Sequence, residues 1–297
     1  MAPWPKRLKR FLRYLAIRAA AAVLGLLPVR WASALGSGMG LVAYWLVWPE
    51  RRKALNSLSV AYPEVTEGER QAIASASFQH LGRSMLELAC VRQIDRDVEA
   101  FIKWPPLDRT ALETALAKKK GVLFISGHIG NWELLARRVA LAGYPCQTIA
   151  KETSDPRLTQ WVDAFRASAK LKAIWRGREG AAKSMLRALK QGEILGMLID
   201  QDTKVQSVWV PFFGQLAKTP RAAADLALRT GAAVMLGFCQ RDETGTYQLR
   251  MHEVAVEADD TSQSLTARLT AGLEQAIRKH PEQWVWVHRR WRSRPGA

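Results

Sequence analysis

Residues 122–133 read Val122-Leu-Phe-Ile-Ser-Gly-His-Ile-Gly-Asn-Trp-Glu133, and this stretch decides the fold class. Its first five residues form a short apolar run that is typical of a strand buried on both faces, and the residues from Asn131 to about Ala142 have the spacing of a helix. A strand that passes through a glycine-flanked turn into a helix is typical of α/β folds. Catalytic groups in such folds gather at the carboxyl ends of strands, where His128 stands.

The alternation of strand and helix continues towards the C-terminus. The residue pattern predicts strands at 146–150, 194–199, 232–238, 247–254 and 284–288, and helices at 156–169, 180–190 and 261–279. Thr219-Pro220 predicts one more helix start, with the threonine as N-cap. We therefore expect an α/β fold with a mixed sheet flanked by helices.

Residues 50–110 have the spacing of amphipathic helices instead, and Trp104-Pro105-Pro106 ends that region. We expect three parts: a basic N-terminal membrane anchor (1–54), a helical region (55–110) and an α/β domain (111–297).

The composition narrows the class of protein. Lys and Arg exceed Asp and Glu by 44 − 27 = 17 in 297 residues, so the chain needs an anionic partner, which is nucleic acid, an anionic membrane face or an acidic protein. A mean hydropathy of −0.14 rules out a polytopic membrane protein. The three cysteines lie far apart, which argues against a disulfide scaffold or a cysteine-based zinc site. Twelve tryptophans favour a membrane interface.

The N-terminal region carries the membrane signal. Residues 1–18 contain six basic residues and no acid, and the 18 residues of 31–48 carry no charge. As a helix, that uncharged run would be about 27 Å long, the lower limit for a bilayer core of about 30 Å. Glycines dilute it, so a shallow or re-entrant anchor is as plausible as a span, and a buried hairpin of two core helices is the alternative. Gly36 and Gly40 lie one turn apart, as in helices that let another helix approach closely.

His128 and Glu133 are the candidate catalytic pair. On a regular helix, a spacing of five puts them about 140° apart, but with His128 in the turn before the helix the chain can bend Glu133 back to one ring nitrogen. The other nitrogen is then a general base, for which acyl transfer is the natural reaction. A structural loop histidine is the alternative. No metal is expected, because two helical ligands need a spacing of four.

Ser-Gly-His-Ile-Gly-Asn-Trp-Glu resembles the H-x-x-x-W-E form of the lysophospholipid acyltransferase motif, and in particular that of the bacterial lipid A biosynthesis (late, secondary) acyltransferases. The resemblance covers nearly the whole chain. Further segments fall in the family's order: the basic N-terminus, Asn56, Leu189-x-x-Gly192-Glu193, Asp200-Gln201-Asp202, Val210–Gly214 and Thr219. Asp-Gln-Asp stands where some relatives have Asp-His-Asp.

The resemblance implies a lysophospholipid-acyltransferase-like fold and a place in lipopolysaccharide biosynthesis. It implies transfer of an acyl chain from acyl carrier protein to a hydroxyl of a lipid A precursor, at the cytoplasmic face of the bacterial inner membrane, without metal or organic cofactor and without nucleic acid. It makes His128 the base and Glu133 its partner, and it places Asn131 and Asp202 at the substrate. Arg166 matches the family's essential arginine best, with Arg176 and Arg178 as competitors.

The remaining candidates each have an ordinary alternative. Arg166 is suited to bind phosphate or the thioester oxyanion, or is one charge on an amphipathic helix. At least one of Asp200 and Asp202 should face the crevice, unless they serve a helix cap or salt bridge. Phe212 and Phe213 offer an apolar wall for the acyl chain, or ordinary core.

Several functions stay open at this stage. The basic tail 289–294 fits an anionic lipid or carrier-protein surface better than nucleic acid. Other acceptors for an acyltransferase are ornithine lipids, phosphatidylinositol mannosides and lysophospholipids. A hydrolase that uses the same dyad on water and a non-enzymatic basic binding protein are the other classes.

Overall fold

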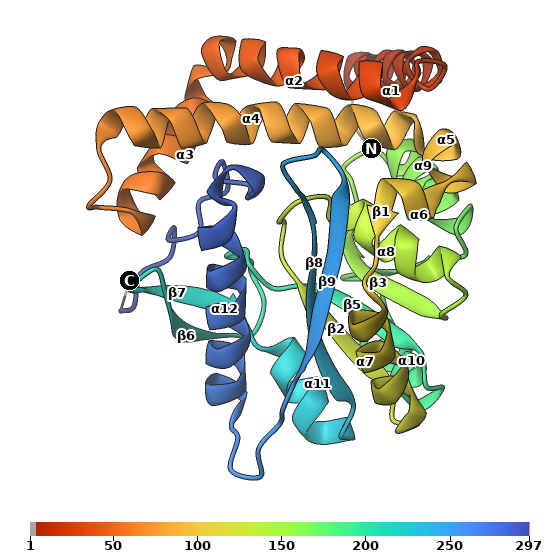
Figure 1. Cartoon of the computed structure of the whole chain (residues 1–297), viewed down its shortest axis with the longest axis vertical. Coiled ribbons are helices and arrows are strands. Elements are labelled where there is room, and N and C mark those ends of the chain that lie inside the picture. The colour runs from red at the N-terminus through yellow and green to blue at the C-terminus, as the bar shows by residue number, and fades with distance from the viewer. Residues whose placement is uncertain (1–3, 297) are drawn as a thin grey trace.

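A computed structural model describes residues 4–296 (Figure 1). Residues 1–3 and 297, the outer ends of the expected anchor and α/β domain, lie outside the described residues. Seven strands form one sheet in the order β1-β9-β8-β2-β5-β3-β4, in which β8 and β9 pair antiparallel and all other neighbours are parallel. The strands are β1 (Ile102–Lys103), β2 (Val122–Ser126), β3 (Cys146–Lys151), β4 (Lys172–Arg176), β5 (Ile194–Leu198), β8 (Ala233–Arg241) and β9 (Tyr247–Val254). A separate antiparallel hairpin consists of β6 (Ser207–Phe212) and β7 (Gln215–Pro220).

Helices cover both faces of the sheet, because the strand side chains alternate between two hydrophobic clusters. In β2, Leu123 and Ile125 face one cluster, while Val122 and Phe124 face the other. The first cluster includes α10 (Ala181–Lys190), α11 (Ala222–Thr230) and α12 (Ser262–Lys279); the second includes α7 (Pro106–Ala117), α8 (Trp132–Leu141) and α9 (Pro156–Ala167). The expected α/β fold with a mixed, helix-flanked sheet is confirmed.

Two local predictions are wrong. Residues 284–288 are not a strand but follow a 3₁₀ turn (Pro281–Gln283). The Trp286 N–H donates a hydrogen bond to the Trp284 carbonyl within the segment. The indoles of both tryptophans are buried. Thr219 is not an N-cap, because Thr219 and Pro220 belong to β7 and α11 begins at Ala222. The edge strand β4 was not predicted.

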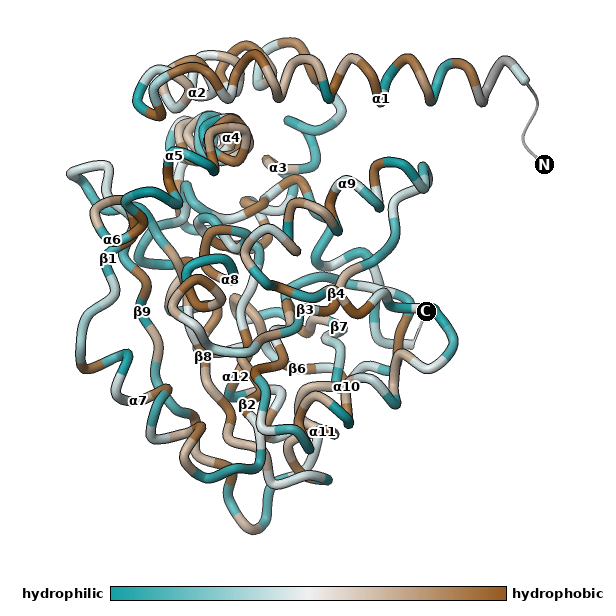
Figure 2. The backbone as a smooth tube through the Cα atoms, turned by 90° about the vertical axis from the view of Figure 1, so that its right-hand side faces the viewer, coloured by the Kyte–Doolittle hydropathy of each residue, from teal (hydrophilic) through white to brown (hydrophobic). Residues whose placement is uncertain are grey.

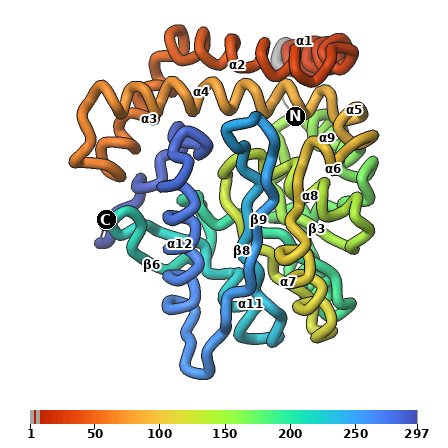
Figure 3. Tube along the Cα trace, viewed as in Figure 1, coloured from red at the N-terminus to blue at the C-terminus, as the bar shows by residue number. Residues whose placement is uncertain are grey.

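The N-terminal third packs as a helical layer across one end of the sheet, above the upper ends of β8 and β9 in Figure 1 (see also Figure 2). Its elements are α1 (Trp4–Leu24), α2 (Val29–Leu46), α3 (Trp48–Ala61), α4 (Glu67–Ala89), α5 (Val91–Arg96) and α6 (Val98–Phe101). Figure 3 shows that the end of α12 returns to α4, and the Ser77 hydroxyl of α4 donates to the Trp284 carbonyl at 2.7 Å. The boundaries expected at residues 54 and 110 stay predictions.

The close helix approach expected at Gly36 and Gly40 is confirmed. A Cβ on Gly36 would overlap the Gly82 carbonyl of α4, and one on Gly40 would overlap the Phe78 carbonyl. Only glycine therefore lets the α2 and α4 backbones come this close.

The opposite side of this layer is apolar and exposed. We call it the α1–α2 apolar face; its members are Leu12, Val23, Leu26, Trp31, Met39, Val42, Trp45 and Leu46, each more than half exposed. The uncharged run 31–48 breaks at Val47, between α2 and α3. Within residues 4–296, no helix combines the length and apolarity that crossing a bilayer requires. The membrane anchor therefore stays a prediction.

Candidate active site

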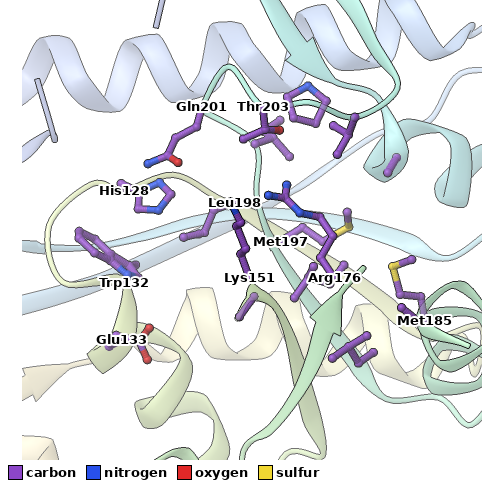
Figure 4. A pocket seen from close by; sticks show the side chains of 18 of the residues that line it. His128, Trp132, Glu133, Lys151, Arg176, Met185, Met197, Leu198, Gln201 and Thr203 are labelled. Carbon is purple, nitrogen blue, oxygen red and sulfur yellow. The ribbon is translucent and has the colours of Figure 1, made fainter. Parts of the chain in front are cut away.

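A cavity of about 350 Å³ opens where β2, β3, β4 and β5 end, the edge at which α/β folds collect their ligands (Figure 4). His128, Glu133 and Arg166 line one part of it. Ile174, Met185, Met197 and Ala222 line another, apolar part. Figure 4 shows His128 and Met185 at opposite sides of the cavity. A long apolar substrate with a reactive polar end fits this arrangement.

His128 lies in the turn between β2 and α8 and is held by Asp200. The His128 Nδ1 lies 2.8 Å from Asp200 Oδ1, and the His128 backbone N–H donates to Oδ2 at 2.7 Å. Trp284 Nε1 donates to the same Oδ2 at 2.8 Å. The pairing follows from the sheet register: Ser126 of β2 is opposite Leu198 of β5, so the second residue past each strand is His128 on one side and Asp200 on the other.

The electrostatics of this pair favour a charged carboxylate and a basic imidazole. Burial alone would raise the pKa of Asp200, but attraction to His128 and the hydrogen bonds it accepts outweigh burial and lower the pKa to about 2. Burial alone would lower the pKa of His128, yet the Asp200 carboxylate outweighs it and raises that pKa above its usual range. Asp200 therefore accepts the Nδ1 proton, and Nε2 is the basic nitrogen.

Glu133 binds Arg166, and this corrects the expected His128–Glu133 hydrogen bond. Arg166 Nη2 donates to Glu133 Oε1 at 2.5 Å and Nε donates to Oε2 at 3.2 Å, a two-pronged ion pair. The reason is geometric: Glu133 lies in the first turn of α8 and meets the last turn of α9, whereas the adjacent strand β5 presents Asp200 to the imidazole.

Of three further candidates, one caps a helix, one lines the cavity and one forms an ion pair at the surface. Asn131 is the N-cap of α8, where its Oδ1 accepts from the Leu134 N–H at 3.1 Å. Arg176 lines the cavity, and Arg178 is exposed and paired with Glu152.

Asp202 is buried but does not line the cavity. Its Oδ2 accepts from the Ser293 N–H at 2.9 Å, and its own N–H donates to His288 Nε2 at 3.1 Å. It therefore ties the C-terminal segment to the end of β5. Arg290 of that basic tail is itself buried and donates to the Lys218 carbonyl at 2.6 Å.

Phe212 and Phe213 do not form the expected acyl wall. Both are buried in an aromatic cluster with Trp284, Trp286 and Trp291, because the tip of the β6–β7 hairpin packs against the C-terminal segment. The cavity's apolar part comes from β4, β5, α10 and the start of α11 instead.

Sequence reasoning missed Trp284, which supports Asp200 from 84 residues away. The available signal was chemical: a buried indole N–H needs an acceptor, and ionised carboxylates accept strongly. Within residues 4–296, no three His, Cys, Asp or Glu side chains gather as metal ligands would.

A His–Asp pair at one end of a partly apolar cavity, on the ligand-binding edge of an α/β sheet, is typical of enzymes that act on substrates with long apolar parts. The chain matches the model of the bacterial lipid A biosynthesis acyltransferase family over residues 5–293, and it belongs to that family. It is an acyltransferase.

Named relatives agree with this assignment. The chain is 27% identical over 271 residues to the lipid A biosynthesis lauroyltransferase of Escherichia coli, covering 88% of this chain and 85% of that protein. It is 26% identical to the E. coli lipid A biosynthesis palmitoleoyltransferase, with the same coverage. It is also 23% identical to a phosphatidylinositol mannoside acyltransferase of Mycobacterium tuberculosis, over 67% of this chain and 61% of that protein.

Proposed function

We propose that this enzyme transfers a fatty acyl chain from acyl carrier protein to a hydroxyl of a lipid A precursor, with His128 as general base. The observation that carries the proposal is the Asp200-bound imidazole at the polar side of a cavity whose other side is apolar. The apolar side suits an acyl chain, and the imidazole suits the hydroxyl that accepts it.

His128 and Asp200 account for the proton transfers. His128 Nε2 takes the proton of the acceptor hydroxyl as its oxygen attacks the thioester carbonyl and forms a tetrahedral oxyanion. Collapse of that intermediate forms the ester and expels the thiolate, which takes the proton back from the imidazolium. Asp200 stays ionised throughout: it fixes the Nδ1–H tautomer and stabilises the imidazolium. The steps use only side chains of this chain, so the proposal includes neither metal nor organic cofactor.

Arg166 is the candidate donor to the oxyanion. Glu133 occupies Nε and Nη2 of its guanidinium, while Nη1 is buried and has no hydrogen-bond partner within residues 4–296. A guanidinium that lines the reaction cavity and is held in place by Glu133 stabilises developing negative charge strongly. Glu133 acts through Arg166 in this scheme, as a positioning residue.

The α1–α2 apolar face supports membrane binding. Exposed apolar surface of this extent on a soluble domain marks an interaction site, and Trp31 and Trp45 have the amphipathic rings suited to the headgroup region. Arg18 and Arg30 add positive charge to the same helices, which attracts anionic lipid. We propose that this face rests on the cytoplasmic leaflet of the bacterial inner membrane and does not bind nucleic acid.

The test is acyl transfer by the purified protein in detergent. Acyl carrier proteins loaded with chains of different length are supplied with a tetra-acylated Kdo-lipid A precursor, and mass spectrometry follows the acceptor. We expect the acceptor to gain one acyl group, and the gain to disappear in His128→Ala.

A second set of reactions supplies phosphatidylinositol mannoside, because one relative is named for that acceptor. Acylation of that lipid alone would overturn the assignment of lipid A as the acceptor. The conclusion that the protein is an acyltransferase would stand. Release of free fatty acid without any acylated acceptor would identify a hydrolase instead.

A further inference from the structure

The segment 170–190 holds much of the chain's excess positive charge. It contains seven basic residues and one acid, Glu179, so its net charge is 7 − 1 = +6 of the chain's +17. The basic residues are Lys170, Lys172, Arg176, Arg178, Lys183, Arg187 and Lys190, and all seven are exposed.

Strand β4 and helix α10, which follow one another in the chain and pack together, carry five of these residues. β4 is the edge strand of the sheet, and α10 returns along it after the four-residue turn Gly177–Gly180. Lys172 and Arg176 lie four apart in the strand, so they share one side. On α10 the spacing of three and four gives a second row: Lys183, Arg187 and Lys190. We call these five residues the β4–α10 basic face.

The charges on this face have no internal counterpart. Of the seven basic residues in the segment, only Arg178 forms an ion pair within residues 4–296, with Glu152. Arg187 and Lys190 lie in the last turn of α10, where the helix dipole favours cations. Lys183 lies in the first turn, where the dipole disfavours a cation, and Arg187 repels it from four residues away. Helix stability therefore does not explain Lys183, and an external anionic partner does.

We propose that the β4–α10 basic face docks the acidic acyl carrier protein that donates the acyl chain; this deepens the proposed function and rests on it. The face adjoins the cavity, because Arg176 of β4 and Met185 of α10 both line it. A carrier bound there holds its thioester arm beside the opening. The acyl tail reaches Met185 and Met197 while the carbonyl approaches His128.

The position of the face separates the carrier from the bilayer. In Figures 1 and 2, which share their vertical axis, α1 and α2 lie at the top, whereas α10 lies in the lower half of the molecule, below β4 in Figure 2. The α1–α2 apolar face and the β4–α10 basic face can therefore be occupied at once, the first by lipid and the second by a water-soluble protein. Anionic headgroups carry the same charge as the carrier, so the experiment must distinguish the two.

The test compares two charge reversals of equal size. Lys183→Glu with Arg187→Glu alters the face, and Lys120→Glu with Arg229→Glu is the matched control; each pair changes the net charge from +17 to 17 − 4 = +13. Lys120 and Arg229 are exposed, do not line the cavity and form no ion pair among the described residues. Arg229, like Arg187, lies in the last turn of its helix, so these two substitutions perturb helix dipoles similarly, and Lys183→Glu places an acid in the first turn of α10, where the dipole favours it.

Three measurements are made on each variant. The first is the KM for the acyl-loaded carrier protein at low and high salt. The second is the KM for an acyl-pantetheine thioester without the carrier protein. The third is binding to anionic vesicles. In the variant of the β4–α10 basic face, Lys183→Glu with Arg187→Glu, we expect the KM for the acyl-loaded carrier protein to rise about tenfold at low salt and less at high salt. We expect kcat to be unchanged. KM for the small thioester and vesicle binding should equal those of the control.

Each contrary result has a separate meaning. Equal KM for acyl-carrier protein in face and control variants overturns the docking surface, as does an equal rise for both donors. Loss of vesicle binding in the face variant alone assigns the face to the membrane and also overturns it. A wild-type protein that transfers from neither donor refutes the proposed function itself.

Discussion

Replacing Asp200 by asparagine tests the pairing that the fold imposes on His128. The substitution keeps the shape of the side chain and removes the charge that lies 2.8 Å from Nδ1. A hydrogen bond to a charged group contributes about 1.5–3 kcal/mol. If that stabilisation applies to the imidazolium in the transition state, kcat/KM falls about ten- to one-hundred-and-fifty-fold, since about 1.4 kcal/mol corresponds to a factor of ten.

The pH profile gives a second, independent signature. A base must be neutral, so kcat/KM falls as the pH drops below the pKa of His128, which Asp200 raises above its usual range. Without the carboxylate, burial dominates and lowers that pKa. We therefore expect the acidic limb of the kcat/KM profile to lie at lower pH in Asp200→Asn than in the wild type. The plateau value of kcat/KM should be lower in the variant.

Acyl transfer followed by mass spectrometry between pH 5 and 9 measures both effects. Asp202→Asn is the matched control, because Asp202 is also buried but bonds Ser293 instead of His128. Its acidic limb should coincide with that of the wild type. An Asp200→Asn enzyme with the wild-type limb and rate would refute the assignment of Asp200 as the partner of the base.

Three further predictions follow from packing and charge. Arg166→Ala should abolish most turnover and Arg166→Lys should restore little, because a lysine cannot bond both Glu133 oxygens and also donate to the oxyanion; single-turnover rates measure this. Gly36→Leu should lower the free energy of unfolding by at least about 2 kcal/mol in a denaturant titration, because its side chain would overlap the Gly82 carbonyl. Met185→Ala should shift the preferred donor to longer acyl chains in a competition among carrier-bound acyl groups, each methylene of fit contributing about 1–3 kcal/mol.

Two strands have the bounds that the sequence predicted, and for different reasons. β2 is an apolar run buried on both faces, whereas in β9 buried residues alternate with more exposed ones over its first six positions. β4 was missed because an edge strand with Lys172 and Arg176 at its ends lacks a continuous apolar run. Residues 284–288 were wrongly predicted as a strand because they do form an apolar run. The side chains of tryptophans can be buried equally well in a turn.

The sequence predicted some members of the candidate site and not their pairing. His128 and Arg166 line the cavity as local pattern and family resemblance suggested, but the partner of His128 depends on which strand lies beside β2. Strand order is a long-range property, because β5 lies beside β2 in the sheet although β3 and β4 separate the two strands in the chain. The local spacing between residues 128 and 133 contains no information about that order.

The C-terminal segment connects the pairing of His128 to the stability of the whole chain. Trp284 donates to Asp200, and Ser293 and His288 bond Asp202 two residues further on. The Ser77 hydroxyl of α4 donates to the Trp284 carbonyl, and α4 packs against the glycines of α2. Asp200 can remain ionised while buried only as long as His128 and the Trp284 indole stay in place beside it, because an unpaired buried carboxylate would protonate. The helical layer that carries the α1–α2 apolar face therefore supports, through Trp284, the Asp200 charge that raises the pKa of His128.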